Sequence, residues 1–111
     1  MSYRLKKSEK ELLFAVRDYI KEHLNEGLSQ KTLSRKAQMN KVKYCRGFRE
    51  LFGSNPSVYI LAQRMAFAHS IIAGTDKPIK EISSLAGYRN VKSFHRVFIK
   101  FYGFTPSSLR N

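Results

Sequence analysis

Apolar residues recur along this chain at steps of three and four, which is the spacing of helices that bury one face. One such series lies within the first 24 residues, and another extends from residue 58 to residue 72. The two series are Leu12, Leu13, Val16, Ile20 and Leu24, then Val58, Leu61, Met65, Ala68 and Ile72. No run alternates apolar and polar residues between tight turns, as a half-buried strand would. The pattern therefore predicts an all-α chain.

Capping residues and prolines predict where the helices begin and end. Ser8 is followed by Glu11 at the spacing of a capping box, and the helix that they open should end near Gly27. Three prolines stand where a first-turn proline is tolerated, each behind a residue that can cap a helix. These pairings are Asn55 with Pro56, Asp76 with Pro78, and Thr105 with Pro106. Helices are therefore expected to begin near 56, 78 and 106.

The chain also repeats itself with an offset of 50 residues. The segment NKVKYCRGFRELFGSNP at 40–56 aligns with NVKSFHRVFIKFYGFTP at 90–106, so that Tyr44 meets Phe94 and Arg46 meets Arg96. Each copy reads as a short helix, a tight turn and a longer helix, which is the helix-turn-helix pattern. We predict one domain over 1–111, with two such units at 8–54 and 76–111 joined by a linker helix at 55–75.

The longer helix of each copy has an apolar side and a cationic side. In the second copy, Phe94, Phe98, Phe101 and Tyr102 form one apolar stripe. Residues that lie between about 100° and 200° round the helix from that stripe form the outer side. The outer residues are Lys92, His95, Arg96 and Ile99 in the second copy, and Val42, Cys45, Arg46 and Arg49 in the first. Each helix is thus anchored on one side and suited to a polyanion on the other.

The net charge predicts the same class of partner. With 21 Lys and Arg against 8 Asp and Glu, the chain carries a formal charge of +13. Such a charge points to nucleic acid, an anionic membrane surface or an acidic protein. Five of the eight acids lie in the first 26 residues and none follows Glu81. No stretch approaches the roughly 20 apolar residues that a membrane span needs, so no membrane insertion is expected.

Catalytic, metal and cofactor sites are not indicated. His23, His69 and His95 fall on three different predicted helices, and no histidine or cysteine pair has the spacing of zinc ligands. The single cysteine, Cys45, excludes an internal disulfide and suits a reducing cytosol. No glycine-rich phosphate-binding loop occurs. We therefore expect neither an enzyme nor a bound cofactor.

Duplex DNA fits the cationic helices, because its major groove admits one α-helix and presents a distinct pattern for each base pair. Arg46 and Arg96 are the expected base readers, since arginine can bond guanine through two nitrogens. Val42 or Val91 would contact a thymine methyl group, while Lys41, Lys43, Arg49 and Lys100 suit phosphates. The candidate DNA-binding residues are Lys41, Val42, Lys43, Cys45, Arg46, Arg49, Asn90, Val91, Lys92, Ser93, His95, Arg96 and Lys100.

The second unit, IKEISSLAGYRNVKSFHRVFIKFYGFTPSSLR, resembles the signature of the AraC/XylS family of bacterial transcription regulators. Its marks are an I-x-E-I start, Gly87-Tyr88 at the turn, F-x-R-x-F from Phe94, and Gly-x-Thr-Pro closed by Arg110. The first unit resembles the family's first helix-turn-helix, and Arg64 with Ala68 resembles its linker helix. The first-unit positions that carry the resemblance are Leu33, Arg46, Phe48, Arg49, Gly53 and Tyr59.

The resemblance implies a monomeric, homeodomain-like domain of about seven helices that places its two longer helices in adjacent major-groove segments. It also implies a bacterial activator in the cytoplasm, associated with the nucleoid and with RNA polymerase as a further partner. By position, the implied DNA contacts are Lys41, Val42, Cys45, Arg46, Val91, Lys92, His95 and Arg96. Three residues depart from the pattern: Ser83 replaces alanine, Ile99 replaces a cation, and Gly47 costs about 1 kcal/mol of helix propensity.

Two other functions share part of these features. A non-specific nucleic-acid-binding or architectural protein needs the charge but not two cationic helices in register. A protein-interaction module that recruits polymerase would bind a polymerase subunit without DNA. The specific reader, in contrast, should have its two reading helices about one helical turn, roughly 34 Å, apart along the duplex. Neutralising about five to eight phosphates would give its binding a log–log salt slope of about −5 to −7.

Overall fold

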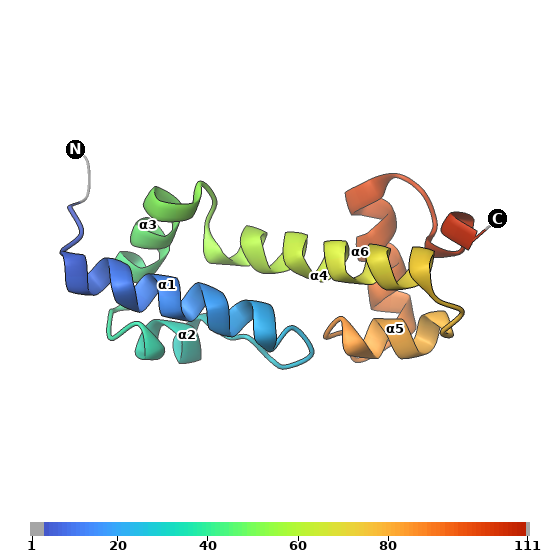
Figure 1. The fold of residues 1–111 in the computed structure, drawn as a ribbon, viewed down its shortest axis with the longest axis horizontal. Coiled ribbons are helices and arrows are strands. Elements are labelled where there is room, and N and C mark those ends of the chain that lie inside the picture. Colours follow the sequence, from blue (N-terminus) through green and yellow to red (C-terminus); the bar gives the residue numbers. More distant parts are fainter. Residues whose placement is uncertain (1–3, 111) are drawn as a thin grey trace. The chain divides into compact units, whose positions relative to one another are not determined.

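The computed structural model describes residues 4–110, which form six α-helices and a final 3₁₀ turn and contain no strand (Figure 1). The all-α prediction is confirmed. Two compact units divide these residues, one comprising 4–23 and 28–60 and the other 24–27 and 61–110. The elements are α1 (Lys7–Glu22), α2 (Gln30–Lys36), α3 (Lys41–Phe52), α4 (Pro56–Gly74), α5 (Ile79–Leu85), α6 (Val91–Tyr102) and η1 (Pro106–Arg110).

The core of the first unit is formed by α1, α2 and α3 together with the start of α4. Its buried apolar residues are Leu13, Val16, Ile20, Leu33, Ala37, Tyr44, Phe48 and Ile60. Gly47 lets α3 approach the chain of α1 closely, because a Cβ there would lie 2.9 Å from Leu13 Cδ1 and 3.1 Å from Leu5 Cδ2. The glycine that weakens the helix propensity of α3 is therefore a packing position.

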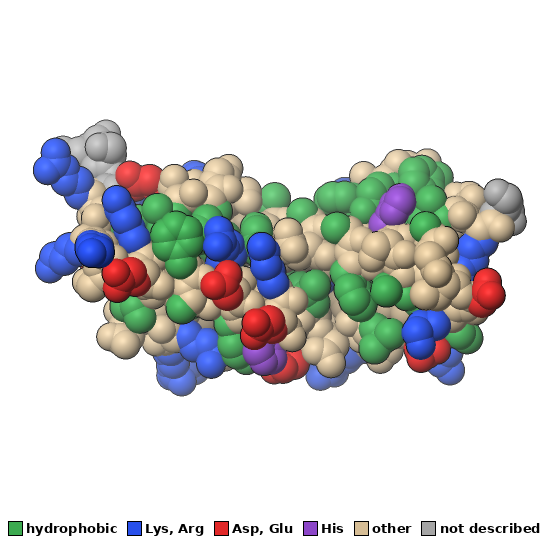
Figure 2. Space-filling model, in the orientation of Figure 1, with side chains coloured by type: hydrophobic (Ala, Val, Ile, Leu, Met, Phe, Trp, Pro, Cys, Tyr) green, Lys and Arg blue, Asp and Glu red, His purple; other side chains and the backbone are tan. Residues whose placement is uncertain are grey.

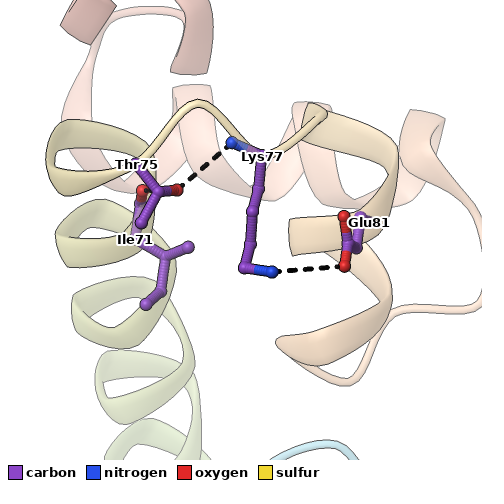
Figure 3. A network of polar contacts seen from close by, with 4 residues as sticks. All are labelled: Ile71, Thr75, Lys77 and Glu81. Carbon is purple, nitrogen blue, oxygen red and sulfur yellow. Dashed lines mark hydrogen bonds and ion pairs between the residues drawn. The ribbon is translucent and has the colours of Figure 1, made fainter.

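The core of the second unit gathers residues of α4, α5 and α6, namely Met65, Ala68, Ile72, Ile82, Ala86, Phe94 and Phe98. Polar contacts join the end of α4 to α5 (Figure 3). The Lys77 amide donates to Thr75 Oγ1 at 3.3 Å, and Lys77 Nζ lies 3.5 Å from Glu81 Oε1. Arg110 closes the same end of α4, donating to the carbonyls of Ile72 at 3.0 Å and Thr75 at 2.8 Å.

The ends of α1 differ from the prediction. The helix begins at Lys7, because the Lys6 amide donates to the Glu9 carboxylate at 2.8 Å and so makes Lys6 the N-cap. Ser8 lies inside the helix, and the predicted capping box is wrong. The helix also ends at Glu22 rather than near Gly27. Residues 24–27 belong to the second unit, where Arg64 donates to the carbonyls of Leu24 at 3.2 Å and Glu26 at 2.8 Å.

The second helix of each helix-turn-helix pair, α3 in the first unit and α6 in the second, begins and ends in the same way. Asn40 Oδ1 accepts from the Lys43 amide at 2.8 Å, and Asn90 Oδ1 accepts from the Ser93 amide at 2.8 Å. Each helix then ends at a glycine in the left-handed region, with φ of 84° at Gly53 and 83° at Gly103. The repeat that the sequence shows is thus a repeat of backbone geometry.

The buried face of α6 is narrower than its apolar stripe. Phe94 and Phe98 are completely buried, as expected, and Tyr102 is half-buried. Phe101, placed in the same stripe by its spacing, is 45% exposed. It lies at the edge of the stripe beside Tyr102, with the two ring centroids 4.8 Å apart. The apolar stripe therefore extends beyond the buried face of α6.

Gly87 sits at a close approach between three segments of the second unit. Its φ is +96°, in the region that disfavours any side chain. A Cβ at this position would also collide with the Leu24 carbonyl and with the Arg64 guanidinium. The turn between α5 and α6 is therefore packed against the segment that Arg64 holds.

We predict that Gly87→Ala destabilises the protein far more than Gly103→Ala. Both glycines have positive φ, but a Cβ at Gly103 would meet nothing within 4 Å. Gly103→Ala should cost about 1 kcal/mol and Gly87→Ala about 3 kcal/mol or more, since only the latter adds a collision with backbone. Urea unfolding followed by circular dichroism measures both losses. Equal losses would show that the close approach at Gly87 does not contribute.

Candidate nucleic-acid interface

The outer face of α3 carries most of the first-unit candidates at the surface. Lys41, Val42, Arg46 and Arg49 are exposed, and Val42 shows 63% of its surface. Cys45 is half-buried and carries a free thiol. On the opposite side of the helix, Tyr44 and Phe48 are completely buried. The helix thus divides into an anchored face and a face that is open to a partner.

The outer face of α6 repeats this arrangement. Its exposed candidates are Asn90, Val91, Lys92, His95, Arg96 and Lys100, while Ser93 is half-buried. Val91, Lys92, His95 and Arg96 together line a shallow hollow in the surface. Ile99, which replaces the cation of the family pattern, is half-buried. Asn90 uses its side-chain oxygen to cap the helix, which leaves its amide NH₂ group for other partners.

Lys43 is the candidate whose surroundings differ from expectation. It forms an ion pair with Glu9 of α1, and the pair ties the start of α3 to the start of α1. Lys43 and the Lys6 amide both lower the pKa of Glu9, Lys43 contributing more. A phosphate would therefore have to compete with a carboxylate for this lysine, which makes Lys43 a weaker clamp than its exposed neighbours.

Acidic side chains are scarce on the two outer helices. α3 contains one, Glu50, and α6 contains none. Over α1, in contrast, the two signs are mixed, and Figure 2 shows Lys, Arg, Asp and Glu side chains interspersed there. Positive charge without nearby acids is what a phosphate backbone binds, so α3 and α6 are the electrostatically suited surfaces.

Other kinds of site find no support in the described part of the chain. Within residues 4–110, no three His, Cys, Asp or Glu side chains lie close enough together to hold a metal ion. None of the helices described is both long and apolar enough to cross a membrane.

Sequence reasoning missed two residues that shape this interface from other helices. In the sequence, Glu9 is one of several acids near the start of the chain, yet in the fold it is the partner of Lys43. Arg64 was matched to a linker-helix position without a role, and it holds the segment that packs on the α5–α6 turn. Neither contact has a periodic signal, because each joins residues more than 30 positions apart.

A family model described as a helix-turn-helix domain matches residues 33–111. Among curated proteins, the probable transcriptional regulator LumQ of Photobacterium leiognathi is 29% identical over 107 residues, which are 96% of this chain and 43% of LumQ. The regulatory protein SoxS of Salmonella typhimurium is 27% identical over 104 residues, 94% of this chain and 97% of SoxS. The chain therefore spans less than half of the first relative and nearly all of the second.

Solved structures show the same fold. The DNA-binding domain of the global transcriptional factor AdpA, solved in complex with a target DNA, superposes with a TM-score of 0.84 and 28% identity over 89% of each chain. The C-terminal domain of AraT, a response regulator of Geobacillus stearothermophilus, gives a TM-score of 0.85 at 24% identity, covering 97% of this chain and 87% of that one.

We predict that Lys43→Gln raises the pKa of Glu9 toward its ordinary value, because Lys43 is the main cause of the lowering. NMR titration of the Glu9 carboxyl measures the change. Lys10→Gln, which removes an exposed cation of α1, is the matched control and should change the pKa less.

The effect of this pair on stability has a definite sign. Because the pKa of Glu9 is lower in the folded state, the pair stabilises the fold at neutral pH, and its contribution disappears as the pH falls through that lowered pKa. An unchanged Glu9 titration in Lys43→Gln would show that the two side chains do not pair in solution.

Proposed function

This chain belongs to the AraC-type family of helix-turn-helix transcription regulators, and we propose that it reads double-stranded DNA through α3 and α6. Sequence-specific binding of double-stranded DNA in transcription regulation is the function of such a domain, and the family and fold are not those of enzymes. The observation that carries the proposal is the repeated build of the two helices. Each has an asparagine cap, a buried aromatic pair and an exposed cationic face.

Base reading falls to the side chains at the centre of each exposed face. Arg46 and Arg96 occupy equivalent positions and are both exposed, so each can reach a guanine edge with two nitrogens. Val42 lies one turn before Arg46 and Val91 lies five residues before Arg96. They are exposed by 63% and 38% and suit a thymine methyl group. Cys45 and His95 lie beside the arginines and complete the two reading surfaces.

The remaining cations bind the backbone. Lys41 and Arg49 flank Arg46 on α3, and Lys92 and Lys100 flank Arg96 on α6, so each set can span the groove that its helix enters. Lys43 binds a phosphate less strongly than these cations, because the phosphate has to compete with the Glu9 carboxylate for it. The side-chain NH₂ group of Asn90 and the hydroxyl of Ser93 add polar contacts at the start of α6. These contacts position the domain, and the central residues select the sequence.

At the level of the whole protein, we propose a bacterial transcription activator that acts in the cytoplasm on the nucleoid. Relatives of this chain include a regulator more than twice its length and one of nearly equal length, and both are bacterial regulatory proteins, which supports a role in bacterial transcription regulation. The domain binds as a monomer, because its two units supply the two reading helices that other helix-turn-helix proteins obtain by dimerisation. RNA polymerase is the protein partner expected of an activator.

We predict that selection from random duplexes at about 150 mM salt, near physiological screening, recovers two short preferred blocks about ten base pairs apart. Two reading helices on one face of the duplex require this spacing. Arg46→Ala and Arg96→Ala should each erase a different block. Strong retention without any enrichment, or equal retention of RNA, would show backbone binding alone and overturn the proposal.

Arg96→Ala should weaken binding to the selected site by about 1–3 kcal/mol and relax the preference at one base pair. Binding to random duplex should change much less, because the lost contact is to a base. Lys100→Ala is the matched control on the same helix, and it should weaken selected and random duplexes by the same factor. Equal losses for Arg96→Ala on both duplexes would assign Arg96 to the backbone.

A further inference from the structure

The segment Arg4–Lys10 carries four cations among its seven residues, although its local surroundings do little to stabilise them. Lys6 is the N-cap of α1 and Lys7 its first helical residue, whereas the positive end of the helix macrodipole favours acids at this end. Glu9 is the one acid of the segment, and Lys43 pairs with it. Among the described residues, none of Arg4, Lys7 and Lys10 forms an ion pair. Local stability therefore does not explain these charges.

The segment is fastened to α3 at two points. Leu5 is half-buried, and its Cδ2 and Cδ1 atoms would lie 3.1 Å and 3.5 Å from a Cβ on Gly47. One turn earlier along α3, Lys43 pairs with Glu9, which also accepts from the Lys6 amide at 2.8 Å. The cationic segment is thus in contact with α3 at Gly47 and Lys43.

This contact lies at the edge of the reading face. Lys43 and Gly47 fall about 60° and 100° round α3 from Arg46, between Arg46 and the buried Tyr44. The segment therefore runs along the flank of the reading helix, with Leu5 turned inward. Arg4 and Lys7, on either side of Leu5 and Lys6, are exposed.

We propose that the segment Arg4–Lys10 extends the DNA interface of the first unit, with Arg4 and Lys7 binding phosphates that border the groove entered by α3. Leu5 fixes the segment to the reading helix, so the two move onto the duplex together. Glu9 does not oppose the contact because Lys43 pairs with it. Glu11, the next acid, is exposed one turn beyond Lys7 and forms no ion pair among the described residues. The inference rests on the proposed DNA binding by α3.

The test compares three variants that each remove one positive charge: Arg4→Gln, Lys7→Gln and Lys21→Gln. Lys21 is the matched control, being exposed in the last turn of the same helix. Binding to the selected duplex and to a random duplex of equal length is measured over a series of salt concentrations. Each lost phosphate contact lowers the steepness of the log–log slope by about 0.9 and the affinity at ~150 mM salt about fivefold.

Arg4→Gln and Lys7→Gln should reduce the salt slope and the affinity by the same amount on both duplexes, whereas Lys21→Gln should leave the slope unchanged. Lys7→Gln should also raise the Tm, because it removes a cation from the positive end of α1, and Lys21→Gln should lower it. Weaker binding by a more stable protein cannot come from damage to the fold. Phosphate ethylation should interfere with binding beside the first block for the parent and not for the double variant Arg4→Gln/Lys7→Gln.

The inference would be overturned if Arg4→Gln and Lys7→Gln had the same log–log salt slope as the parent protein. It would also be overturned if Lys21→Gln lost slope and affinity to the same extent. If the parent selects two blocks while these variants bind as it does, only this extension of the interface fails. If the parent selects no sequence at all, the proposed reading of DNA fails first. The outcomes therefore separate the two proposals.

Discussion

Each reading helix depends on an aromatic pair that anchors it, Tyr44 with Phe48 in α3 and Phe94 with Phe98 in α6. All four side chains are completely buried. Burying a side chain of this size contributes about 1.5–3 kcal/mol, whereas a pair of like charges one turn apart on a helix costs a few tenths, roughly 0.2–0.5 kcal/mol. The free energy gained by burying the aromatic pair is therefore several-fold larger than the cost of like charges on the opposite face of the helix. The cations of the outer face can remain without acidic partners, which is the condition for binding a polyanion.

The two units share this frame but present different chemistry. The capping hydrogen bonds of Asn40 and Asn90 have the same length, and the φ angles of the closing glycines differ by one degree. Yet α3 offers Val42 and Cys45 beside Arg46, and α6 offers Val91 and His95 beside Arg96. A common backbone fixes where a side chain meets the duplex, while the side chain decides which base it meets. In the DNA binding that we propose, two unlike reading surfaces with a common backbone geometry favour an asymmetric target over a palindrome.

Features with a local period could be predicted from the sequence, and features made by distant residues could not. The buried face of α6 follows from the spacing of Phe94 and Phe98, because helical geometry brings them to one side. Phe101 fits the same spacing and is nevertheless exposed, since only neighbouring elements decide where a stripe ends. The pairing of Lys43 with Glu9 and the early end of α1 depend on contacts between segments. The candidate faces were therefore predictable, and the partners that constrain them were not.

The scarcity of acids also shapes how two structural arginines, the half-buried Arg64 and the exposed Arg110, are hydrogen-bonded. Arg64 is partly desolvated, which lowers its pKa, and it donates to the carbonyls of Leu24 and Glu26. Arg110 likewise donates to two carbonyls at the end of α4. A carboxylate in either place would satisfy the guanidinium more strongly, but it would also cancel a positive charge. Carbonyl oxygens complete the hydrogen bonds and leave the net charge of +13 intact. Since the attraction to DNA depends on that charge, main-chain acceptors allow arginine to serve the fold without weakening the interface.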